Sequence, residues 1–173
     1  MGPWNECIDG IYSSLFGRTA VTEIAEAIDK YATAEFIDEL ENRSLAHRID
    51  LTRALSSYLL DAGTVEELVV ALEDAVQNRD KSWAVARCLP YAQALRGLDS
   101  GDASEVEAGI EGLIQFHYDH VASARDADVI QRTVALDAAA MLALARREGV
   151  AISADHEAIP DVLNDDQHYP VGE

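Results

Sequence analysis

The feature that most limits the fold of this chain is the spacing of its apolar residues. Almost throughout, they recur every three or four positions, as on one face of an α-helix, and no segment alternates with period two for long enough to make a strand. The clearest stripe consists of Val65, Leu68, Val69, Leu72 and Val76. Hydrophobic residues make up 49% of the chain and aromatic residues only 6%, which suits closely packed helices built from Ala, Leu, Val and Ile. The sequence therefore predicts an all-α fold.

Start and stop signals divide the chain into about seven helices, which we expect to form a compact bundle of antiparallel neighbours. Capping residues mark two starts, Thr64–Glu67 and Asp102–Glu105, while Gly63 and Gly149 mark two ends. Pro90 lacks an amide hydrogen, so we expect it to kink or restart the fifth helix. The expected helices begin near residues 7, 19, 44, 64, 82, 102 and 127, with a break near residue 33 and a restart over 36–40.

Two of these helices have matching stripes. Val65, Val69 and Leu72 in one correspond to Val106, Ile110 and Leu113 in the other. Such a match is typical of helical-hairpin repeats, but it also arises by chance between amphipathic helices. Helical-hairpin repeats therefore stay open as an alternative to a simple bundle.

At 173 residues the chain is expected to form a single domain, 1–173, which is long enough to bury roughly 70% of its unfolded surface.

We expect its last long helix to run from about Ala127 to Arg147. Beyond Val150 there are six acidic residues and no Lys or Arg, and residues 164–173 are expected to form a loose acidic tail. The expected core face of the last helix comprises Ile130, Val134, Ala138, Met141, Leu142 and Ala145.

The cysteines and the N-terminus point to the cytoplasm. Cys7 and Cys88 are far apart and lack CxxC spacing, so we expect two reduced, mostly buried thiols. The first residues show no signal-peptide pattern, and no window is apolar for long enough to span a membrane. We therefore expect a soluble cytoplasmic protein with no membrane partner.

The chain is strongly acidic. It has 32 Asp and Glu residues against 13 Lys and Arg residues, a formal net charge of -19 at pH 7, and its only lysines are Lys30 and Lys81. Such a surface suits either a basic protein partner or a solvent so salty that the Debye length falls to about 3 Å at 1 M. The shortage of Lys favours salt, so we expect a halophilic source. The same charge excludes nucleic acid as a partner, because phosphates demand a basic patch.

One group of side chains has the composition of a metal site. His117 and His120 both fall near the apolar stripe of their helix, and Asp137 lies on the apolar face of the next helix. If the two helices turn near residue 124, Asp137 lies about 7 Å beyond the level of His117 at about 1.5 Å per residue, too far to share one ion directly. The alternative is that both His are partly buried and hydrogen-bonded, while Asp137 accepts hydrogen bonds from a neighbouring helix.

No sequence motif indicates catalysis. The chain contains no GxSxG, no phosphate-binding loop and no HExxH, and acidic neighbours such as Glu66 and Glu67 are expected among so many carboxylates. We therefore predict no catalytic, cofactor-binding or metal-binding residue, no cofactor and no enzyme activity.

The segment MLALARREGVAISADHEAIPDVL, residues 141–163, ends a helix in Ala-Leu-Ala-Arg-Arg-Xaa-Gly and continues through an apolar step to Pro-Xaa-Xaa-Leu. It resembles the C-terminal half of the immunity protein 49 family, and the likeness covers about residues 89–163. The resemblance implies an all-helical protein that binds and neutralises a toxin from a polymorphic secretion system.

On this resemblance, we expect a binding protein that covers a protein toxin with an apolar patch ringed by carboxylates. Trp83, Tyr91 and Tyr118 are candidate aromatic anchors, and core packing is the alternative for each. Two other functions stay open: a metal-dependent enzyme that uses His117, His120 and an unidentified third ligand, and a helical scaffold or assembly protein. Whether the chain forms a homo-oligomer is also open.

Overall fold

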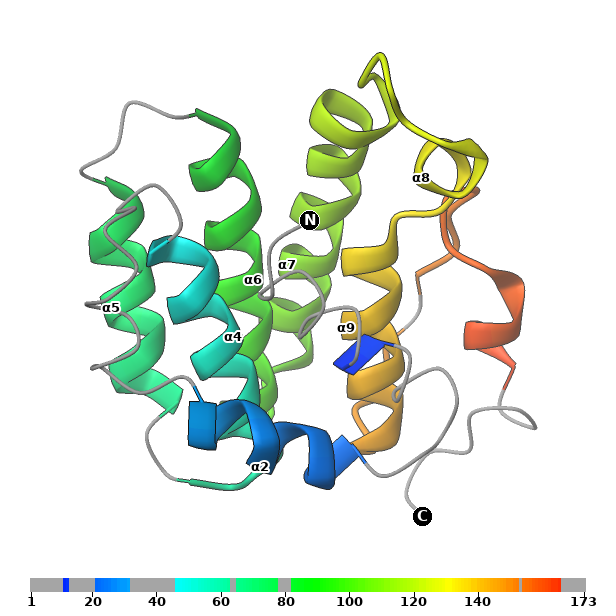
Figure 1. The fold of residues 1–173 in the computed structure, drawn as a ribbon. Coiled ribbons are helices and arrows are strands. Elements are labelled where there is room, and N and C mark those ends of the chain that lie inside the picture. The colour runs from blue at the N-terminus through cyan, green and yellow to red at the C-terminus, as the bar shows by residue number, and fades with distance from the viewer. Residues whose placement is uncertain are drawn as a thin grey trace. The chain divides into compact units, whose positions relative to one another are not determined.

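The computed structural model describes residues 11–12, 21–31, 46–62, 65–77, 82–152 and 154–165 (Figure 1). Within these ranges the chain forms seven α-helices and no strand, which confirms the all-α fold. Contacts divide the chain into two compact units, residues 1–80 and 81–173, which are described separately. The single domain, the antiparallel order of the bundle and the helical repeats stay predictions.

The first unit is organised around one central helix. Its α-helices are α2 (Val21–Tyr31), α4 (Ala46–Leu59) and α5 (Val65–Gln77), and α4 contacts both of the others (Figure 1). Leu72 is fully buried, as the stripe at helical spacing predicts. Over residues 51–59 and 65–74, whose burial is described, the other buried apolar residues are Leu51, Ala54, Leu55, Val65 and Val69.

Helix α4 ends at Leu59, and the left-handed residue that stops it is Asp61, two residues before the predicted stop at Gly63. Asp61 adopts a positive φ of 49°, its N–H donates to the Tyr58 carbonyl at 3.1 Å, and the N–H of Ala62 donates to the Ser57 carbonyl at 3.0 Å. This pair of bonds is a Schellman motif, in which the left-handed residue is usually Gly. Asp is one of the few other residues that tolerates this conformation, so the prediction of Gly63 as the stop was wrong.

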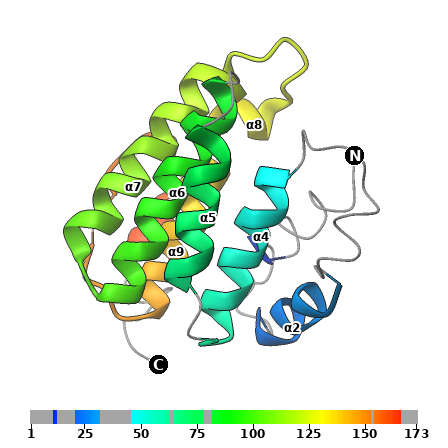
Figure 2. The ribbon, with the colours of Figure 1, turned by 90° about the vertical axis from the view of Figure 1, so that its left-hand side faces the viewer.

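The second unit contains a pair of long helices and several shorter elements. Helices α6 and α7 lie side by side (Figure 2), and α7 also contacts α9. Pro90 lies inside α6 and does not restart it. The elements of this unit are α6 (Ser82–Ser100), α7 (Ala103–Phe116), the π-helix η2 (His117–Ala122), α8 (Val129–Thr133), α9 (Leu136–Arg147) and the 3-10 helix η3 (Asp161–Asn164).

Glycine allows α6 and α7 to approach closely. A Cβ atom on Gly109 would lie 2.6 Å from the backbone N of Ala94, and one on Gly97 would lie 2.7 Å from the backbone N of Val106. Real side chains do not tolerate such distances, so both positions require Gly for this packing.

The predicted start of α7 is confirmed. The Asp102 carboxylate accepts hydrogen bonds from the backbone N–H groups of Ser104 at 3.0 Å and Glu105 at 3.3 Å, which satisfies two of the free donors of the first turn. The N–H of Asp102 itself donates to the Gly97 carbonyl at 2.8 Å. The predicted core face is buried in full and comprises Val106, Ile110, Leu113 and Ile114.

The predicted continuous helix over residues 127–147 was wrong, because it is split into α8 and α9. At the break, Val134 is extended, with φ -124° and ψ 122°, and the N–H of Ala135 donates to the Ala158 carbonyl at 2.9 Å. This bond to a distant segment replaces the helical bond that the same N–H would make to Gln131. Ile130, predicted in the core, is exposed as a result.

Helix α9 is buried around its whole circumference. Every residue from Ala138 to Arg146 is buried, so the predicted core positions of this helix are confirmed but do not form a single stripe. The predicted stop is confirmed too: Gly149 has a φ of 77°, and the N–H of Val150 donates to the Ala145 carbonyl at 2.9 Å.

Several predictions fall outside the described residues. These are the first helix apart from Ile11 and Tyr12, the restart over 36–40, the cap at Thr64, Cys7 and tail residues 166–173. Cys88 is buried, as expected. None of the helices in the described ranges combines the length and apolar character required to cross a membrane.

Candidate functional site

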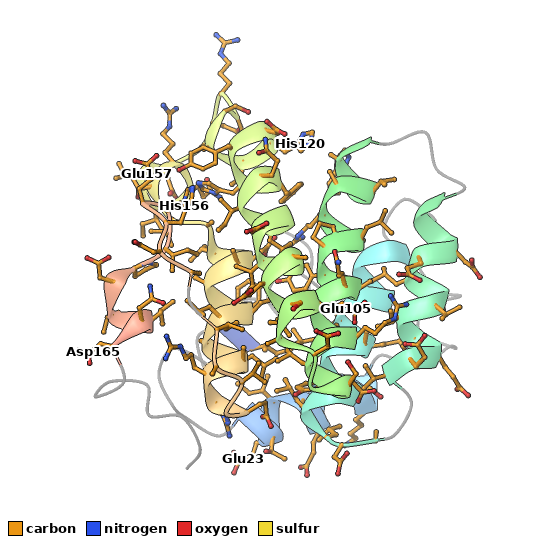
Figure 3. All side chains as sticks on the ribbon, turned by 180° about the vertical axis from the view of Figure 1, so that it is seen from behind. Glu23, Glu105, His120, His156, Glu157 and Asp165 are labelled. Atoms are coloured by element: carbon orange, nitrogen blue, oxygen red, sulfur yellow. The ribbon has the colours of Figure 1, made fainter. Side chains whose placement is uncertain are left out.

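Three of the side chains that the sequence singled out lie on the π-helix η2, which continues α7 without a break: His117, Tyr118 and His120. Its hydrogen bonds follow the i→i+5 pattern, which is rare and often marks functional positions. Helix α8 contacts η2, and α7 joins it end to end. Figure 3 shows His120, His156 and Glu157 at this same end of the second unit.

His117 is the buried member of this group. Its side chain is 3% exposed, and its Nε2 atom has no hydrogen-bond partner among the residues that the structure describes. Burial lowers the pKa of His117 below 6.5; the hydrogen bond to the Arg132 backbone and the charge of Asp137 act in the opposite direction, and His156 lowers the pKa further. The imidazole is therefore held neutral in a position where a charge is costly.

Tyr118 connects His117 to the segment that follows α9. Its ring packs edge-on against the rings of His117 and His156, with centroid separations of 5.3 Å and 5.6 Å. Its hydroxyl donates to Glu157 Oε1 at 3.0 Å. Burial raises the pKa of Tyr118 above 10.0, and the adjacent Glu157 carboxylate raises it further. The phenol is therefore a hydrogen-bond donor that keeps its proton.

His120 does not point inward as predicted. Its side chain is exposed, and its ring lies 5.4 Å from the ring of Phe116. The prediction assumed the rotation of a regular α-helix, whereas the π-helix turns less per residue and carries His120 off the buried face. Of the two predicted inward His, only His117 is buried.

Asp137 is held by an ion pair to the neighbouring helix. Arg87 donates from Nε to Oδ2 at 2.8 Å and from Nη2 to Oδ1 at 2.9 Å, and the Tyr91 hydroxyl donates to Oδ1 at 3.3 Å. The part of the alternative that concerns Asp137, which was expected to accept hydrogen bonds from a neighbouring helix, is therefore confirmed. Its carboxylate fixes α9 against α6.

The described part of the chain contains no group of three His, Cys, Asp or Glu side chains that could hold a metal ion. His117, His120 and Asp137 are not brought together as a ligand set, because His120 faces outward and Asp137 binds Arg87. The metal-dependent enzyme therefore has no candidate site in these residues.

The three predicted aromatic anchors have different environments. Tyr91 is fully buried, so it belongs to the core and the prediction of a partner contact there was wrong. Trp83 is half-buried. Tyr118 is 36% exposed and is the anchor candidate that solvent reaches most readily.

The apolar surface around α8 was missed by the sequence interpretation. Val129 and Ile130 begin this helix, and both are exposed. A local signal was present: Asp128 accepts from the Gln131 N–H at 2.8 Å while Gln131 accepts from the Asp128 N–H at 3.0 Å, a capping box that marks a separate helix start. Recognising it would have placed the start of the helix at Val129, although not its end at Thr133.

These features define a class of protein. The described residues form an all-helical fold in which His117 is buried and Asp137 joins α9 to α6, while four of the six exposed large apolar side chains lie between residues 118 and 136. Residues 27–163 match the immunity protein 49 family, and the chain belongs to it. The match confirms the resemblance seen over residues 89–163 and extends it far into the first unit. Neither the curated proteins nor the solved structures give a significant match.

Proposed function

We propose that this chain neutralises a protein toxin by binding it and covering the surface on which its toxicity depends. The observation that carries the proposal is the match of residues 27–163 to the immunity protein 49 family. Occlusion needs affinity and shape rather than chemistry of its own, which agrees with an all-helical fold in which the Asp137 carboxylate is held by Arg87 of another helix.

Co-expression tests this function directly. The chain is expressed together with each toxin encoded beside its gene, and growth and complex formation are measured. We expect one toxin to stop growth alone, to be tolerated with the chain and to co-purify with it. A non-cognate acidic helical protein expressed at the same level serves as the control and should give no rescue. The proposal fails if no neighbouring toxin is toxic, or if none is rescued or bound.

We further propose that both proteins work in a cytoplasm of molar salt. The support comes from the composition. The chain has 32 acidic residues but only 13 Lys and Arg residues, and its only lysines are Lys30 and Lys81. At about 1 M salt the Debye length of about 3 Å removes most repulsion between surface carboxylates. A toxin from the same solvent is then acidic as well, so long-range attraction contributes little to binding.

A further inference from the structure

Helix α8 exposes the apolar side chains that a short helix normally turns toward the core. Val129 is 77% exposed, Ile130 is 59% exposed, and none of the five residues of α8 is buried. Two adjacent aliphatic side chains in water are unfavourable unless another surface covers them for part of the time.

These residues belong to a local cluster. Within the described ranges, six large apolar side chains are exposed, and four of them lie between residues 118 and 136. Tyr118 lies on η2, which α8 contacts, and Leu136 begins the next helix. The four residues are Tyr118, Val129, Ile130 and Leu136.

Residues 125–132 differ in charge from the residues that precede them. Residues 97–124 contain six acidic residues and no Lys or Arg. Residues 125–132 contain Arg125, Arg132 and two aspartates, so their formal charge is zero, and both arginines are exposed. Asp128 is already engaged as the cap of α8, where its carboxylate accepts from Gln131. Outward-facing arginine beside apolar surface and a tyrosine is the composition of a binding hot spot.

We propose that the Ile130 surface, defined as Tyr118, Arg125, Val129, Ile130 and Arg132, is where the toxin binds. The partner surface is apolar and bordered by carboxylates that pair with Arg125 and Arg132. An acidic toxin meets repulsion over the exposed carboxylates of α7, whereas residues 125–132, which supply four of the five residues of the Ile130 surface, have a formal charge of zero and two exposed arginines that complement its charge. The fifth residue, Tyr118, lies beside Glu157, to which its hydroxyl donates. This inference rests on the proposed function and adds the location and chemistry of the interface.

The test is a binding measurement with the cognate toxin in molar KCl. Val129→Asp and Ile130→Asp each place a charge in the apolar centre of the interface, and we expect each to weaken binding by at least about 30-fold. Because neither side chain is buried, both variants should keep the helical circular dichroism and melting temperature of the wild type. Arg125→Glu should weaken binding too, and more strongly as the salt is reduced.

A matched control separates this surface from apolar exposure in general. Val70 on α5 is 42% exposed, and Val70→Asp should bind the toxin as the wild type does. If the wild type binds no toxin, the proposed function fails and this inference with it. If the wild type binds and Val129→Asp and Ile130→Asp bind equally well, the function stands and the Ile130 surface is overturned. A wild-type dimer that Ile130→Asp dissociates, with toxin binding unchanged, would assign the surface to a second copy and also overturn the inference.

Discussion

At the scale of single residues, the ion pair between Arg87 and Asp137 is a bidentate polar contact between two elements of the second unit. Two hydrogen bonds of 2.8 Å and 2.9 Å join the guanidinium and the carboxylate, and the ring of Tyr91 lies 5.9 Å from the guanidinium carbon. The pair connects α6 to α9 in a largely buried setting, where losing one partner costs more than on a surface.

We expect Asp137→Asn to lower the free energy of unfolding by about 2 kcal/mol, because the Arg87 guanidinium keeps its burial but loses its counter-charge. Urea denaturation measures the change. Asp126→Asn removes an exposed carboxylate and is the control, with an expected change within about 0.5 kcal/mol. Equal effects of the two substitutions would show that the ion pair adds nothing to stability.

The second prediction at this scale concerns pH. Burial, the largest influence, lowers the pKa of His117 below 6.5, so the unfolded chain binds a proton at a higher pH than the folded chain does. The contribution of the neutral, buried His117 to the free energy of unfolding is therefore fully present above pH 6.5. It is lost as the pH falls through the pKa that His117 has in the folded chain. A hydrogen bond to the Arg132 backbone and the charge of Asp137 limit the lowering of this pKa, and His156 adds to it, while the Tyr118 ring packs against the imidazole.

Two measurements check the direction of this pH dependence. NMR titration of the folded protein should place the midpoint of His117 below 6.5. The difference in unfolding free energy between the wild type and His117→Gln should fall as the pH drops from 6.5 and become constant below the folded pKa. A midpoint at or above 6.5 would contradict the proposed effect of burial.

At the scale of elements, the packing of α6 on α7 depends on small residues at defined positions. A Cβ atom on Gly109 meets the backbone of the facing helix, at 2.6 Å from Ala94 N and 2.7 Å from Pro90 O. A Cβ atom on Gly112 meets only the Pro90 ring closely, at 2.7 Å from Cγ and 2.8 Å from Cβ. A backbone cannot move without shifting the helix, whereas a ring pucker can adjust.

We therefore expect Gly109→Ala to destabilise the protein by about 2 kcal/mol, even though Ala gains about 1 kcal/mol of helix propensity over Gly. Gly112→Ala has the same gain in helix propensity, but its new Cβ contacts only the Pro90 ring, which can adjust. The free energy of unfolding of this variant should therefore change by no more than about 1 kcal/mol. Chemical denaturation of both variants gives the comparison. If Gly109→Ala were as stable as Gly112→Ala, the close contact with the α6 backbone would not constrain the packing.

The elements also show which parts of the structure can be predicted from sequence. Helix α7 could be predicted because its cap at Asp102 and its stripe from Val106 are local signals. The break between α8 and α9 could not, since it depends on a bond between Ala135 and Ala158, far apart in sequence. The π-helix also could not be predicted from the apolar spacing. It changes the rotation per residue after Phe116, so the helical period placed His117 correctly on the buried face but placed His120 there wrongly.

At the scale of the whole molecule, the family match crosses both units, since it begins at residue 27 and ends at residue 163. The part of the chain that the sequence interpretation recognised lies within the second unit, where the Ala-rich helix α9 and the Gly149 turn give a distinctive pattern. The first unit has the same helical character but weaker local motifs. Membership of the family was therefore predictable from one unit alone.

The net charge of -19 leads to the last prediction, which concerns the molecule in its solvent. Carboxylates without nearby cations repel one another at low ionic strength, and salt screens this repulsion. We expect the melting temperature to rise steeply between low and molar KCl. Residues 97–124 should contribute strongly, because they contain six acidic residues and no Lys or Arg.

A paired substitution tests whether screening is the cause. Glu107 and Glu111 are exposed and lie one turn apart on α7, so Glu107→Gln with Glu111→Gln removes a like-charge pair worth about 0.2–0.5 kcal/mol. The double variant should melt higher than the wild type by about 1–2 °C at low salt and at the same temperature in molar KCl, where the repulsion is already screened. A melting temperature that does not respond to KCl would instead favour a basic partner as the reason for the acidity, and the toxin would then be expected to carry the opposite charge.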